Sequence, residues 1–131
     1  MRKSEAEIKE EKQKLVEDFP FLDGWEGSVG PGWLPLLRRV ATVIEAEVKK
    51  AGPLYELRQP YKVGQIKEKF GGLRFYWDDF SNEAIYQAIQ AAENLSYTIC
   101  EDCGDTGTRH SDGWIKTVCD PCWQIYIDRT R

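Results

Sequence analysis

Apolar residues recur at helical spacing in three segments of the chain, which predicts three helices. The three segments differ in how many apolar side chains they contribute to the core. Residues 3–18 are strongly charged and carry a thin apolar stripe, so we expect a helix that is held to the body without building the core. The segment from Trp33 or Leu34 to Lys50 has the most continuous apolar face and predicts the main core helix. Residues 82–96 predict a third helix. The apolar positions are Ile8, Leu15 and Val16 in the first segment, Leu36, Leu37, Val40, Val43, Ile44 and Val48 in the second, and Ile85, Ile89, Ala92 and Leu95 in the third.

The ends of these helices carry residues that cap or interrupt a helical backbone. Ser4 followed by Glu7 has the spacing of a capping box, in which each side chain accepts a hydrogen bond from the other residue's backbone N–H. Phe19 precedes a proline and therefore avoids the helical region, which predicts the end of the first helix. Ser81 or Asn82 is expected to cap the third helix.

Alternation of apolar and polar residues predicts a β-hairpin over residues 61–69 and 73–78. The first of these segments gives a mixed signal, whereas the second alternates clearly. Its two sets are Leu73, Phe75 and Trp77 against Arg74, Tyr76 and Asp78. Phe70-Gly71-Gly72 supplies the turn, because glycine readily adopts the positive φ that tight hairpin turns require.

Residues 21–32 are rich in glycine and aromatic residues, and we expect this connection to be ordered because large apolar side chains favour a packed environment. Two interpretations stay open for Phe21, Trp25 and Trp33. They form a lid of aromatic side chains over the core, or they are exposed and make a patch through which Trp25 and Trp33 bind a partner protein.

The four cysteines of the chain form two CxxC pairs separated by fifteen residues: Cys100, Cys103, Cys119 and Cys122. This spacing is typical of a four-thiolate zinc site, and we expect a structural Zn²⁺ ion held by all four sulfurs. Four cysteines fill the coordination shell, which leaves no position for a catalytic water. Two disulfides are the alternative. His110, the single histidine, is expected to lie in the loop between the two pairs, without a catalytic role.

These elements together predict an α+β fold, in which helices pack on a small antiparallel sheet that contains the 61–78 hairpin. The chain is expected to end in a four-cysteine unit of the zinc-ribbon or treble-clef type, with a strand over 113–118 and a helix after Asp120-Pro121. We divide it into a body over residues 1–98 and a zinc-binding unit over 99–131 that packs on the body.

The distribution of charge along the chain adds a candidate binding region to the predicted fold. The 131-residue chain has a net charge of −4, which argues against a general nucleic-acid-binding protein. Residues 58–76 nevertheless carry five basic residues and one acidic residue, while residues 77–99 carry four acidic residues and no basic one. The basic residues of the first block are Arg58, Lys62, Lys67, Lys69 and Arg74.

The sequence predicts a cytoplasmic protein without membrane partners. No stretch approaches the ~20 apolar residues of a membrane-spanning helix. The charged N-terminus is followed by no apolar segment, so we expect no signal peptide. Paired cysteines without an export signal point to a reducing compartment, where thiols bind metal.

The string Gln65–Tyr76, with the helix after it and Gly113-Trp114 before the second CxxC pair, resembles a set of small uncharacterised bacterial and bacteriophage proteins over about residues 33–125. The resemblance implies a phage or mobile-element product that works in bacterial cytoplasm. It implies no activity and no functional residue.

Two functions follow from these patterns. We expect a non-enzymatic binding protein that modulates or inhibits a host protein complex of defence or transcription, because the acidic chain suits competition for a basic groove. No paired nucleophile and base or phosphate-binding loop is apparent in the sequence. The alternative is a protein that binds single-stranded or duplex nucleic acid through the basic hairpin 62–77. Its contacts would be Lys67, Lys69, Arg74 and Tyr76.

Overall fold

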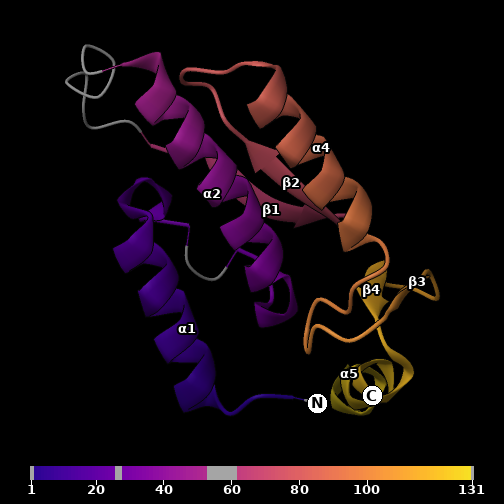
Figure 1. The fold of residues 1–131 in the computed structure, drawn as a ribbon. Helices are drawn as coiled ribbons and strands as arrows, with labels where there is room; N and C mark the ends of the chain where they lie inside the picture. Colours follow the sequence, from indigo (N-terminus) through magenta and orange to yellow (C-terminus); the bar gives the residue numbers. More distant parts are fainter. Residues whose placement is uncertain (1, 26–27, 53–61, 131) are drawn as a thin grey trace.

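The computed structural model describes residues 2–25, 28–52 and 62–130, and over these residues the chain has the predicted α+β fold. Figure 1 shows the helices and two separate two-stranded antiparallel sheets. The helices are α1 (Glu5–Asp18), α2 (Leu34–Ala51), α4 (Glu83–Ser96) and α5 (Asp120–Thr130), and the strands are β1 (Gln65–Lys69), β2 (Gly72–Tyr76), β3 (Thr108–His110) and β4 (Lys116–Val118). Arg58 of the basic block and Tyr61, the predicted start of the hairpin, lie outside the described residues.

Helix α1 is capped as predicted. The Oγ of Ser4 accepts a hydrogen bond from the Glu7 backbone N–H at 3.1 Å, and the Glu7 carboxylate accepts one from the Ser4 N–H at 3.0 Å. The helix ends at Phe19, whose N–H donates to the Leu15 carbonyl. Leu15 is its one buried residue, so α1 lies on the body with little apolar anchoring.

The core lies between α2, α4 and the inner face of the β1–β2 hairpin. Figure 1 shows α2 and α4 side by side in front of that hairpin. The fully buried side chains here include Leu37, Val40 and Ile44 of α2, Ile85 of α4, and Ile66 and Leu73 of the sheet. Their apolar area supplies the main driving force for this packing, at roughly 25 cal/mol per Å² removed from water.

The last turn of α4 differs from the prediction that Leu95 lies on the buried face of this helix. Leu95 is 37% exposed, while the neighbouring Ser96 is fully buried. Ser96 is buried because its hydroxyl makes two hydrogen bonds. The Oγ accepts from the Leu73 backbone N–H at 2.9 Å and donates to the Glu93 carbonyl at 2.6 Å. The helix therefore turns a hydroxyl toward the hairpin, which satisfies a buried N–H of β2.

The hairpin turn is shorter than predicted. It consists of Phe70-Gly71, with φ values of 53° and 84°, and Gly72 belongs to β2. A two-residue turn with positive φ at both positions matches the twist of the strands it joins. Gly72 is glycine for a packing reason, since a Cβ there would lie 2.4 Å from the Tyr97 hydroxyl oxygen.

The aromatic residues of the 21–33 connection belong to the core. Phe21, Trp25 and Trp33 are exposed by 4%, 3% and 0%, so the interpretation of Trp25 and Trp33 as a protein-binding patch is wrong for this conformation. Short 3-10 turns at Pro20–Leu22 and Pro31–Trp33 fold the connection inward. The burial follows from the size of these side chains, each of which removes a large apolar area from water.

The C-terminal unit contains a strand that the sequence pattern did not indicate. β3 pairs with β4, and the predicted strand over 113–118 is limited to the three residues of β4. Residues 111–115 instead form the connection between the strands, where Gly113 has a φ of 83°. Among the described residues, none of the helices has the combined length and apolar character that crossing a bilayer demands.

Candidate metal centre and adjoining basic face

The thiols of the two CxxC pairs converge at one point. The Sγ atoms of Cys100, Cys103, Cys119 and Cys122 all lie within 4.8 Å of one another, and those of Cys103 and Cys119 are 3.7 Å apart. A tetrahedral site with metal–sulfur bonds of about 2.3 Å has edges of about 3.8 Å. The four cysteines are therefore positioned to bind one metal ion.

Two turns from different parts of the unit present these sulfurs. Cys100 and Cys103 lie in the turn that follows α4. This turn ends at Gly104, which has a φ of 87°. Cys119 follows β4, and Cys122 is in the first turn of α5. A thiolate at this end of α5 is favoured by the positive end of the helix dipole.

The protonation of the thiols is uneven. Burial raises the pKa of Cys100, but hydrogen bonds from the backbone N–H groups of Cys119, Cys103 and Asp102 outweigh it and leave that pKa below its ordinary value. Burial raises the pKa of Cys103 to about 11 and also raises the pKa of Cys122. The raised pKa values mean that the Cys103 and Cys122 thiols keep their protons at neutral pH, so metal binding has to release protons.

Backbone hydrogen bonds join the cysteine turn to the N-terminal body. The Gly32 N–H donates to the Glu101 carbonyl at 2.7 Å, and the indole Nε1 of Trp33 donates to the Ile99 carbonyl at 2.9 Å. A Cβ on Gly32 would lie 2.0 Å from the Cys100 carbonyl oxygen, so no larger residue fits. The position of Cys100 consequently depends on the folded body.

A buried ionic group reinforces the same junction. The Glu101 carboxylate accepts from the Gly30 N–H at 2.9 Å and lies 3.3 Å from the Lys116 ammonium, which also lies 3.3 Å from Asp102. Burial raises the pKa of Glu101, against the attraction of Lys116. Removing one partner would leave a buried charge unpaired, which is strongly unfavourable.

The predicted basic residues lie together on the outer face of the hairpin. The pairing register places Lys67 opposite Arg74, with Lys69 and Tyr76 on the same face, whereas Phe75 points into the core. The Lys67 ammonium lies 5.6 Å from the centre of the Tyr76 ring, which is 44% exposed. This is the geometry of a cation–π contact at the surface.

Two residues that sequence reasoning missed extend this face onto the cysteine unit. Tyr97 accepts a hydrogen bond from the Arg74 guanidinium at 3.2 Å, and this bond raises the pKa of Arg74. The guanidinium of Arg109, on β3, lies 6.0 Å from the centre of the Tyr97 ring. We call the set Lys67, Lys69, Arg74, Tyr76, Tyr97 and Arg109 the basic face. Gly72 leaves room for the Tyr97 ring, a contact that the sequence pattern did not indicate.

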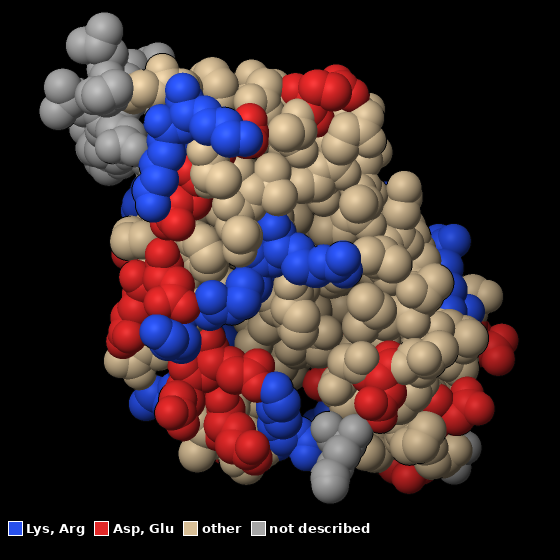
Figure 2. All heavy atoms as spheres, in the orientation of Figure 1, with Lys and Arg blue, Asp and Glu red and all other residues tan. Residues whose placement is uncertain are grey.

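Among the residues that the structure describes, the cations of the basic face are not paired directly with carboxylates, unlike Lys14 and Arg38. Figure 2 shows acidic and basic side chains intermingled over α1, where Lys14 and Arg38 both pair with Asp18. Within the described part of the chain, the four cations of the basic face form no ion pair with a carboxylate. Their charge is available to an anionic ligand.

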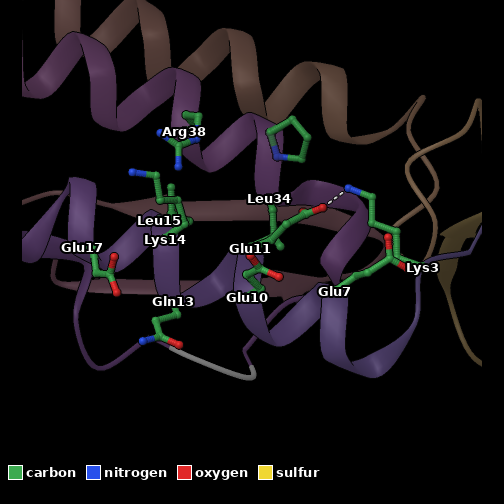
Figure 3. Close-up of a pocket in the computed structure, with 11 residues that line it drawn as sticks. Lys3, Glu7, Glu10, Glu11, Gln13, Lys14, Leu15, Glu17, Leu34 and Arg38 are labelled. Carbon is green, nitrogen blue, oxygen red and sulfur yellow. Dashed lines mark hydrogen bonds and ion pairs between the residues drawn. The ribbon is translucent and has the colours of Figure 1, made fainter.

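A cavity of about 850 Å³ lies between α1 and α2. Figure 3 shows charged side chains around it, with Lys3 paired to Glu11, and Leu15 and Leu34 supplying apolar surface. These residues mix ion pairs with few apolar groups, as expected where a weakly anchored helix rests on its support. We assign this cavity no ligand.

His110 lies in β3, which corrects its predicted place in a loop. Its ring stacks on Trp123 of α5 with centroids 4.4 Å apart, and its Nε2 lies 3.9 Å from the Asp120 carboxylate. The side chain thus packs the small sheet against α5. Stacking of this kind adds a modest stabilisation to the area that it buries.

Comparison of the chain with protein-family models, curated proteins and solved structures finds no match.

Proposed function

We propose that the protein is a non-enzymatic, zinc-stabilised protein that binds single-stranded nucleic acid through the basic face. The observation that carries this proposal is a set of four cations that, among the described residues, form no ion pair with a carboxylate and lie on one face beside the exposed Tyr76 ring and the half-buried Tyr97 ring. Cations attract the phosphates of a nucleic-acid backbone, and aromatic rings stack on its bases.

The metal in this proposal is zinc with a structural role. Four thiolates at tetrahedral spacing are the donor set of structural zinc sites, in which protein ligands complete the coordination shell. The ligand-bearing turn is joined to the body at Glu101, and the basic face includes Arg109 of the same unit. Zinc would therefore hold Arg109, the residue that the cysteine unit contributes to the basic face, in place.

Nucleic-acid binding, the alternative in the sequence analysis, thus takes precedence over modulation of a host protein complex. The host-protein interpretation used Trp25 and Trp33 as contacts, and both are buried. Modulation of a host complex and a phage origin stay predictions. Net acidity does not oppose the nucleic-acid proposal, since attraction near the surface depends on the local charges within a Debye length of about 8 Å.

The proposal is tested by fluorescence anisotropy with a labelled single strand of about 12 nucleotides, at salt concentrations from about 50 to 200 mM. We expect affinity to fall steeply as salt increases. Lys67→Glu with Lys69→Glu should reduce affinity at least tenfold and make the salt slope shallower by about 1.4, because each single-strand phosphate contact contributes about 0.7.

The matched control is Lys9→Glu with Lys12→Glu, which makes the same charge change on α1. It should alter affinity by less than about threefold, as screening suppresses the effect of distant charges. Equal losses in both double variants, or no binding by the wild-type protein at low salt, would refute binding through the basic face.

A further inference from the structure

The hairpin turn places an aromatic residue where neither the backbone nor the core favours it. Phe70 has a φ of 53°, in the left-handed region that bulky residues rarely adopt. Asn or Asp is the usual residue before glycine in such a turn. The Phe70 ring is also 58% exposed, so burial does not compensate for the backbone conformation. A conformational cost of this kind is often found at a functional position.

A second exposed aromatic residue, Trp114, lines one cavity together with Phe70. Trp114 is 64% exposed and follows Gly113, whose φ of 83° turns the connection between β3 and β4. Phe70 and Trp114 both line a cavity of about 350 Å³, which is within the range of small-molecule sites. In the part of the chain that the structure describes, the two rings make no ring contact with each other.

The segments that carry these two rings contact each other. The Thr117 hydroxyl of β4 donates to the Gly71 carbonyl at 2.6 Å, within a buried environment. A Cβ on Gly71 would lie 3.1 Å from that hydroxyl oxygen and 3.5 Å from a methyl group of Ile115. The hairpin turn is therefore seated on the strand that leads out of the Trp114 connection, and the cavity is preformed.

The described lining of the cavity carries one basic and one acidic side chain. Lys69 lines it, with its ammonium 5.8 Å from the centre of the Phe70 ring, and Lys69 also belongs to the basic face. The one acidic residue of the lining, Glu68, accepts a hydrogen bond from the Gly71 N–H at 2.7 Å and so holds the turn. The cavity thus continues the basic face at its turn end.

We propose that Phe70 and Trp114 form a clamp that stacks one unpaired base of a single-stranded nucleic acid whose backbone lies along the basic face. This inference rests on the proposed function. Aromatic stacking accepts any base, because every base has a π face. A base paired within a duplex has both faces covered by its neighbours, so the clamp should favour single strands over duplexes.

Three variants test the clamp by anisotropy with oligothymidylate, with the matching duplex, and with an abasic strand of equal length. Phe70→Asn and Trp114→Ala should each weaken oligothymidylate binding roughly tenfold, the scale of one lost base stack. Their salt slopes should stay unchanged, since the phosphate contacts remain. The abasic strand should bind wild type and both variants alike. Tyr86→Ala removes a 53% exposed aromatic residue from α4 and should have no effect.

Phe70→Asn separates loss of the clamp from loss of folding, because Asn suits a positive φ and keeps the turn. If wild type binds in a salt-dependent manner and both clamp variants bind oligothymidylate as tightly as wild type, the clamp is refuted and the proposed function stands. If no oligonucleotide binds the wild type, the proposed function fails and the clamp fails with it. A wild-type preference for the duplex would also refute the clamp.

Discussion

Gly32 lies where two backbone segments pass each other without space for a side chain. Gly32→Ala would place a methyl group 2.0 Å from the Cys100 carbonyl oxygen and 2.6 Å from the Gly104 nitrogen. The cysteine turn has to move, so we expect a loss of about 2 to 3 kcal/mol in the free energy of unfolding and a weaker affinity for zinc. Urea unfolding and competition with a chelator measure the two effects.

Gly64→Ala is a suitable control for that change, because the added methyl group would meet the Tyr76 carbonyl at 3.1 Å, on the hairpin. It should lower stability without changing zinc affinity. Retention of normal stability and zinc affinity by Gly32→Ala would show that the close approach imposes no constraint.

Phe70 gives a prediction of the opposite sign. Phe70→Asn replaces a bulky residue at a φ of 53° by one that tolerates this conformation. We expect the free energy of unfolding to rise by about 1 kcal/mol, the scale of the left-handed penalty. Urea denaturation monitored by circular dichroism measures the change. A clear loss of stability would mean that packing of the Phe70 ring outweighs its backbone strain.

Residue-scale features were predictable from the sequence where they depend on neighbours along the chain. The capping box of Ser4 and Glu7 and the two CxxC pairs have fixed spacing, and the structure has both. Tyr97 and Arg109 reach the basic face through contacts with the distant hairpin, so no spacing rule indicates them. The size of Trp33 left two interpretations open, a place over the core or an exposed patch, and the structure shows that it is buried.

At the scale of elements, α1 depends on charge because its apolar anchoring is small. Asp18, in its last turn, is hydrogen-bonded to Lys14 within the helix and to Arg38 of α2, each at 2.9 Å. These bonds lower the pKa of Asp18, with that to Lys14 the larger cause. A carboxylate at this end of a helix opposes the helix dipole, so its ion pairs are what make the position tolerable.

The lowered pKa of Asp18 predicts a dependence of stability on pH. Its contribution is complete above the ordinary aspartate pKa of about 3.9 and is lost as the pH falls below that value through the folded-state pKa. Asp18→Asn should therefore destabilise the protein at neutral pH and match the parent once the Asp18 carboxyl is protonated in both the folded and the unfolded state. Chemical denaturation at a series of pH values measures the difference.

A double-mutant cycle with Arg38→Gln tests whether the pair that joins α1 to α2 contributes to this effect. The two single changes should be less than additive, because each removes the same ion pair. Full additivity at neutral pH would show that Asp18 acts only within its own helix.

Helices and strands were easier to predict from the sequence when their apolar pattern extended over more residues. The face of α2 repeats over eighteen residues, and its predicted bounds agree with the structure within one residue at either end. β3 and β4 have three residues each, which is too short for alternation to be recognised. Their pairing is stabilised by the fold of the cysteine unit around them.

At the scale of the whole molecule, residues 30–33 of the body meet the cysteine unit at the cysteine turn. The hydrogen bonds from Gly30 and Trp33 to the cysteine turn join residues 71 and 66 positions apart in the sequence. No local pattern predicts such contacts, so the sequence indicated a zinc unit packed on a body without showing where the two meet. The consequence is that the order of residues 28–33 depends on the cysteine turn.

Removal of the metal should therefore affect more than the cysteine unit. Without it, the Cys103 and Cys122 thiols keep their protons and the two turns lose their common ligand, so the acceptors at Ile99 and Glu101 are no longer held in place. Hydrogen exchange of chelator-treated and zinc-loaded protein should show lost protection in peptides covering 99–122 and also in those covering 28–36. The centre of α4 should keep its protection, because Ile85 and Ala92 are buried in the core between α2 and the hairpin. Lost protection confined to 99–122 would mean that residues 28–33 stay ordered without the metal, through contacts within the body. Loss that extends through α4 would mean that the core itself does not fold without the ion.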